Sequence, residues 1–130
     1  MNGVYTISSA GDYKFTCSRE TGNRIVVDGT NTSEQDNINI YLDNVNIKTS
    51  AGSALQINNN VKATVTIYLT GINNLTTTNQ SSAGLQKDNE APLIIKTNDS
   101  DTTAGILNAR SIDGDSRPDR TRDGRGIRVL

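Results

Sequence analysis

The sequence of 130 residues has no histidine, no tryptophan and a single cysteine. Without histidine, the Ser-His and Cys-His pairs of nucleophilic enzymes are excluded, as is the commonest zinc ligand. Cys17 by itself forms neither an internal disulfide nor a cysteine-rich metal site. No hydrophobic run is long enough for a membrane-spanning helix, so we expect no membrane insertion.

Strong helix formers are also scarce, and no apolar pattern with the period of a helix persists beyond two turns. Asparagine and threonine instead make up about a quarter of the chain, and glycine and serine are also frequent. Because threonine favours strands while asparagine and glycine favour turns, the composition predicts an all-β fold.

The net charge of the chain is small, but its charged residues are unevenly distributed. The formal net charge of -1 argues against nucleic acid or another general polyanion as the partner. Six of the eight arginines lie from Arg110 onward. Aspartate and arginine alternate between Ser111 and Gly126 with almost no apolar residue, which predicts a polar loop insertion at 111–125.

An internal repeat is the most informative feature of the chain. Residues 38–57 read INIYLDNVNIKTSAGSALQI, and residues 65–87 read VTIYLTGINNLTTTNQSSAGLQK. Both contain IYL, then an apolar residue, a threonine, a pair of small residues and Leu-Gln. The first residues of the two IYL segments, Ile40 and Ile67, are 27 positions apart. The same frame extends upstream and downstream to the segments 23–27, 93–96, 105–108 and 126–129.

Each period of about 28 residues holds three short strands, which cannot bury their own apolar face. Stacked copies, spaced by roughly 4.8 Å, close a continuous core. The repeat therefore predicts a right-handed parallel β-helix, or solenoid, with three short strands per coil. We expect residues 1–130 to form a single domain that comprises the N-terminal coils of a longer solenoid.

The alternation of apolar and polar residues predicts which side chains face the core. On the first face these are Ile38, Ile40, Leu42, Val65, Ile67, Leu69, Leu93 and Ile95. On the second face they are Ile25, Val27, Leu55, Ile57, Leu85, Ile127 and Val129. On the third face they are Val45, Ile47, Ile72, Leu75 and Ile106. The asparagines near its turns are expected to form amide ladders between coils, namely Asn44, Asn46, Asn73, Asn74 and Asn108.

The segments GVYTI, RIVVD, IYLDNVNI, GSALQI and VTIYLTGINNL occur in this order within residues 3–110. They resemble the bacterial carbohydrate-binding-domain-containing proteins, a family of cellulose- and pectin-binding β-helices. This resemblance implies a fold like that of polysaccharide lyases, an extracellular or cell-surface location, and binding of plant polysaccharides, sometimes with calcium. After Arg110 the chain departs from the family pattern, because aspartate and arginine replace its glycine-rich coils and acidic turns.

Two outward columns are candidate ligand-binding sites. Tyr41 and Tyr68 share one repeat position, which Lys96 takes in the next coil. Aromatic rings can stack on the faces of sugars, and an ammonium group can pair with the carboxylates of uronates. The alternative is an aromatic ladder that stiffens the sheet. The second column contains Gln56, Gln86 and Arg128, whose amide and guanidinium groups suit sugar hydroxyls. A ladder of amides bonded to each other is the alternative there.

Asp113 and Asp115 form an Asp-Gly-Asp turn and are the candidate metal site. Carboxylate oxygens are the ligands that calcium prefers. No bidentate glutamate follows them, so a solvated loop without metal is the alternative, and no other cofactor is predicted.

The sequence is compatible with three functions. The first is non-catalytic binding of polysaccharide, including acidic sugars, by a secreted or cell-surface bacterial protein. The second is a structural or adhesive solenoid that forms homo-oligomers through its end coils, because an uncapped strand edge invites pairing. The third is a fragment of a polysaccharide lyase. No arginine or lysine is fixed beside an acidic cluster to act as its base, so we expect no enzyme activity.

Overall fold

The computed structural model describes residues 3–112 and 127–129, the side chains of Arg128 and Val129 excepted. The twelve strands of this part of the chain form three parallel sheets, and the described residues contain no helix. The candidate metal residues Asp113 and Asp115, and the predicted insertion from residue 113 on, lie outside the described residues.

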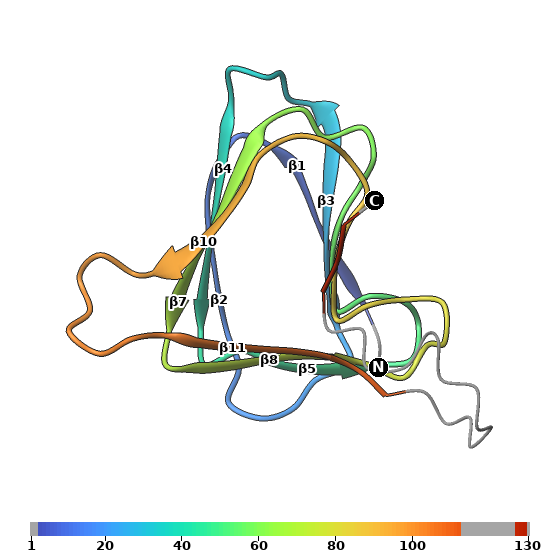
Figure 1. Ribbon diagram of the computed structural model, residues 1–130, viewed down its shortest axis with the longest axis vertical. Helices are drawn as coiled ribbons and strands as arrows, with labels where there is room; N and C mark the ends of the chain where they lie inside the picture. Colours follow the sequence, from blue (N-terminus) through green and yellow to red (C-terminus); the bar gives the residue numbers. More distant parts are fainter. Residues whose placement is uncertain (1–2, 113–126, 130) are drawn as a thin grey trace.

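The three sheets form the three sides of a triangle (Figure 1). Sheet A contains, in spatial order, β1 (Val4–Ser9), β3 (Arg24–Asn31), β6 (Leu55–Ile57), β9 (Leu85–Lys87) and β12 (Ile127–Val129). Sheet B contains β2 (Gly11–Thr16), β4 (Asn37–Asp43), β7 (Thr64–Thr70) and β10 (Leu93–Thr97). Sheet C contains β5 (Asn46–Thr49), β8 (Ile72–Thr77) and β11 (Ile106–Ser111).

The chain passes through sheets A, B and C in turn and then returns to sheet A one level further along. Strand partners are 27 residues apart between Tyr41 and Tyr68 and 28 residues apart between Tyr68 and Lys96. This confirms the predicted all-β parallel solenoid and its period. The first coil departs from the rule of three strands, because Thr21 forms only an isolated bridge to Ile47 in place of a sheet C strand.

The core is a narrow column enclosed by the three sheets. In the central coils, the side chains predicted to point inward from sheets A and B are at most 5% exposed. They are Ile25, Val27, Ile38, Ile40, Leu42, Leu55, Ile57, Val65, Ile67, Leu69 and Leu85. Ile95 and Ile127 continue these columns but are 38% and 51% exposed, because β10 and β12 are the last strands of their sheets.

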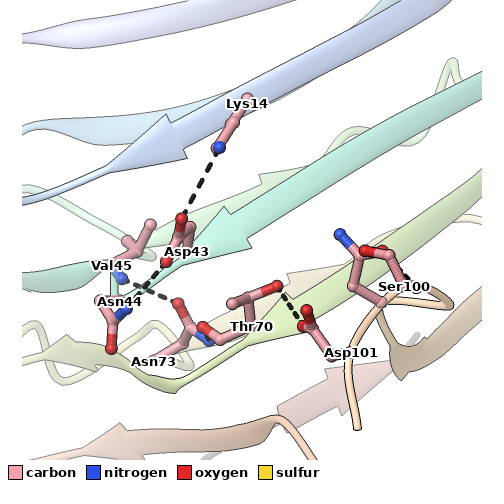
Figure 2. Close-up of polar contacts among 9 residues, drawn as sticks. Lys14, Asp43, Asn44, Val45, Thr70, Asn73, Ser100 and Asp101 are labelled. Atoms are coloured by element: carbon pink, nitrogen blue, oxygen red, sulfur yellow. Dashed lines mark hydrogen bonds and ion pairs between the residues drawn. The ribbon is translucent and has the colours of Figure 1, made fainter.

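The prediction that Ile72 and Ile106 of sheet C face the core is wrong. They are 54% and 46% exposed and pair with each other on the outer face. The inward position is taken by Asn73, which is fully buried. Its Oδ1 accepts a hydrogen bond from the main-chain N–H of Val45 at 2.8 Å (Figure 2). Its Nδ2 donates to the carbonyl groups of Thr70 at 3.1 Å and of Ile106 at 3.3 Å. One amide therefore joins the main chain of three successive coils.

The other asparagines of this face divide between two roles. Asn46, Asn74 and Asn108 are aligned, and Nδ2 of Asn108 donates to Oδ1 of Asn74 at 3.0 Å, which confirms the amide ladder for this pair. Asn44 lies at the corner with a positive φ of 55°, in step with Gly71 at 70°. A side chain at position 71 would strain this left-handed backbone, and its Cβ atom would lie 2.2 Å from Oδ1 of Asn44, so the Asn44 amide would have to move.

We expect Asn73→Ala to lower the free energy of unfolding by about 2–3 kcal/mol, because it leaves the buried N–H of Val45 without an acceptor. Asn74→Ala removes one outer amide contact and is expected to cost less than about 1 kcal/mol. Urea denaturation followed by circular dichroism measures both. Equal losses in the two variants would contradict the role assigned to Asn73.

Candidate functional site

The outer face of sheet B brings the predicted residues together. Tyr41, Tyr68 and Lys96 lie side by side on β4, β7 and β10. The column also includes Lys14 of β2, which pairs with Tyr41. The sequence contains the signal for this fourth member, because Tyr13-Lys14-Phe15 precedes Ile40-Tyr41-Leu42 by the same 27 residues.

The two tyrosine rings stack on each other rather than lying flat on the sheet. Their centroids are 4.6 Å apart, and the angle between their planes is 10°. Nζ of Lys96 lies 5.6 Å from the centroid of the Tyr68 ring, within the range of a cation–π contact. Both faces of Tyr68 are therefore covered, by Tyr41 on one side and Lys96 on the other. This column offers a ligand its ring edges, hydroxyl groups and ammonium groups.

An ion pair lies at each end of this column. Nζ of Lys14 is 3.7 Å from Oδ2 of Asp43 (Figure 2), and Nζ of Lys96 is 3.0 Å from Oδ1 of Asp99. The hydrogen bond to Asp99 raises the pKa of Lys96, and partial desolvation raises the pKa of Tyr41. The paired ammonium groups therefore lie at the two ends of the column, and the phenol hydroxyls lie between them. Exposed ion pairs of this kind are weak, so a ligand can replace either carboxylate.

On sheet A the register places Gln56, Gln86 and Arg128 in one column. Gln86 is only 8% exposed, and its Nε2 donates to the carboxylate of Asp88 at 3.0 and 3.2 Å. Gln56 donates to the same carboxylate at 3.3 Å and accepts from Arg24 at 3.0 Å. These amides are engaged with charged side chains of the protein, and the side chain of Arg128 lies outside the described residues.

A groove of about 590 Å³ lies at the corner where the chain passes from sheet A to sheet B. The loops that precede β4, β7 and β10 form its walls. Pro92 contributes exposed apolar surface to this corner groove, while Glu34, Lys62 and Glu90 contribute charges. Sequence reasoning did not find it, because the three loops, at 32–36, 58–63 and 88–92, differ in composition and share no motif.

Asn60 anchors the middle loop of the corner groove. Its Oδ1 accepts from the N–H of Gly29 at 2.9 Å, and its Nδ2 donates to Oδ1 of Asp28 at 3.0 Å. The hydroxyl and the N–H of Thr30 donate to the same oxygen. These donors, with the Thr30 hydroxyl first and Asn60 second, hold the pKa of Asp28 below its ordinary value. The groove therefore has a wall braced across two coils.

The fold and these outer arrays define a parallel β-solenoid that presents regular rows of polar side chains. Residues 1–115 match the model of the family described as carbohydrate-binding domain-containing protein, and the chain belongs to this family. This confirms the family that the sequence resembles. No curated protein and no solved structure matches the chain.

In residues 3–112 and 127–129 no helix is long and apolar enough to cross a membrane. The same part of the chain contains no group of three histidine, cysteine, aspartate or glutamate side chains placed to hold a metal ion. The calcium site at Asp113 and Asp115 stays a prediction, since both residues lie outside this part.

We expect Asn60→Ala to raise the pKa of Asp28 toward its ordinary value, because one hydrogen-bond donor to the carboxylate is lost. A lowered folded-state pKa adds stability above the unfolded-state value of about 3.9, and this stability is lost as the pH falls through the folded-state pKa. The variant should therefore lose less stability than the parent in this acidic range. Carboxyl NMR titration measures the pKa, and Asn59→Ala, which removes no bond to Asp28, should leave it unchanged.

Proposed function

We propose that this protein is a non-catalytic carbohydrate-binding module, which binds an extended polysaccharide along the solenoid axis over the outer face of sheet B. Family membership supports the ligand class. The face supports the direction, because Lys14, Tyr41, Tyr68 and Lys96 follow one another along that axis. Their spacing of roughly 4.8 Å is close to the length of one pyranose unit, so successive sugars meet successive side chains.

A second row beside this column adds hydrogen-bonding groups. Asp12 and Asn39 are aligned on β2 and β4, and Nδ2 of Asn39 donates to Oδ1 of Asp12 at 2.8 Å. Carboxylate, amide, phenol and ammonium groups together supply both donors and acceptors for sugar hydroxyls. An open face of this kind suits a polymer, which extends beyond the protein in both directions.

The finer features of the proposal follow from the resemblance. The ligand is a plant polysaccharide, and a uronate carboxylate can replace Asp43 or Asp99 at the ammonium groups of Lys14 and Lys96. The protein then acts outside a bacterial cell or on its surface. A lyase assay on polygalacturonate with calcium, read as absorbance of unsaturated products, should stay flat.

We expect the double variant Tyr41→Phe/Tyr68→Phe to bind insoluble cellulose or pectin about tenfold more weakly, because two neutral hydrogen bonds contribute ~1.4 kcal/mol together. Phenylalanine keeps the ring stack, so the variant separates ligand contact from sheet stability. Lys48→Ala on the exposed face of sheet C is the matched control and should bind as the parent does. Unchanged binding by the double variant would remove this column from the site.

A second function, self-association through the end coils, is supported by exposed apolar side chains there. Tyr5 on the first strand of sheet A is 52% exposed, and Ile95 and Ile127 on last strands are 38% and 51% exposed. Such surfaces invite a partner. Sedimentation velocity tests this function: concentration-dependent dimers or larger species would support it, and a monomer at all concentrations would exclude it.

A further inference from the structure

The corner groove contains three charges that no other described residue neutralises. Glu34, Lys62 and Glu90 are all exposed, and within the described part of the chain none of them takes part in a hydrogen bond or an ion pair. The ammonium groups of Lys14 and Lys96 on sheet B, in contrast, are each paired with a carboxylate. The fold therefore leaves the groove charges available to a ligand.

These charges are arranged along the solenoid axis. Glu34, Lys62 and Glu90 belong to the loops of three successive coils, so carboxylate, ammonium and carboxylate follow one another at steps of one coil. The main chains that bear the two glutamates are therefore separated by two strand spacings, on the order of 10 Å. Asn59 lines the same groove with an exposed amide that has no described partner.

The size and the net charge of the groove indicate which class of ligand it binds. A volume of about 590 Å³ lies within the range of roughly 300–1,000 Å³ that is typical of small-ligand sites. Two carboxylates against one ammonium favour a cationic ligand. A neutral sugar leaves all three charges uncompensated, and a uronate meets one ammonium but two like charges. Among sugars, the cationic class is the amino sugars.

We propose that the corner groove binds an amino-sugar polymer of the chitosan type, with the ammonium groups of two sugars paired to Glu34 and Glu90. In an extended ribbon-like chain, groups on the same edge recur at every second sugar, which corresponds to the two strand spacings between these loops. Lys62 and Asn59 donate to hydroxyl oxygens of the sugar between them. This inference rests on the proposed function for the ligand class, carbohydrate, and adds a second site at the corner groove beside the plant-polysaccharide site on sheet B.

The test compares two oligosaccharides with the same backbone, one with ammonium groups and one in which an uncharged acetamido group replaces each of them. Isothermal titration of the full chain with a glucosamine hexamer should give binding about tenfold tighter than with the N-acetylated hexamer, since two exposed ion pairs add this much at low salt. The preference should shrink as salt is raised. Glu34→Gln/Glu90→Gln should abolish it, whereas Glu20→Gln, an exposed change outside the groove, should leave it intact. Lys62→Gln should strengthen glucosamine binding, because it removes the like charge.

Equal affinity for the two hexamers would overturn the inference, and so would a preference for glucosamine that persists in the double glutamine variant. Circular dichroism of each variant verifies that the exposed substitutions leave the fold unchanged. Retention on neutral polysaccharide, measured in parallel, separates the two claims. If neutral polymers bind and the amine adds nothing, only the groove assignment fails. If no carbohydrate binds at all, the proposed function fails with it.

Discussion

Parallel pairing between successive coils is the constraint on which the whole molecule depends. Each strand exposes one side and buries the other, so a shift of one residue would exchange core and surface. Ile40 stacks on Ile67 inside the solenoid only where Tyr41 stacks on Tyr68 outside it. The apolar core and the polar rows on the surface are therefore two consequences of one register.

At the corners the chain turns, and the main-chain hydrogen bonds between coils are interrupted. Short amide side chains replace these hydrogen bonds, since each has both a donor and an acceptor close to the backbone. Asn73 bonds to three coils at the corner between sheets B and C, and Asn60 bonds to Asp28 and Gly29 beside the corner groove. Much of the asparagine content thus serves the architecture.

The side chains that do not hold the fold together are the ones open to a ligand. Gln86 is buried and bonded to Asp88, and the ring faces of Tyr68 are covered by their neighbours in the column. Phenol hydroxyls, exchangeable surface ion pairs and the unpaired charges of the corner groove remain available. Glu34 and Glu90 belong to this last group. The surface therefore has a structural part and a part open to recognition.

The sequence by itself determined the β class, the period and the inward residues of sheets A and B, because all three depend on spacings that are visible along the chain. The alignment of Tyr41 with Tyr68 follows from the same spacing. The choice between Ile72 and Asn73 at the inward position depended on tertiary structure. Hydropathy favours isoleucine there, and only the coils on either side supply the main-chain groups that satisfy a buried amide. Ring orientation and the corner groove were likewise decided by stacking, because the residues that form them lie a full coil apart in sequence.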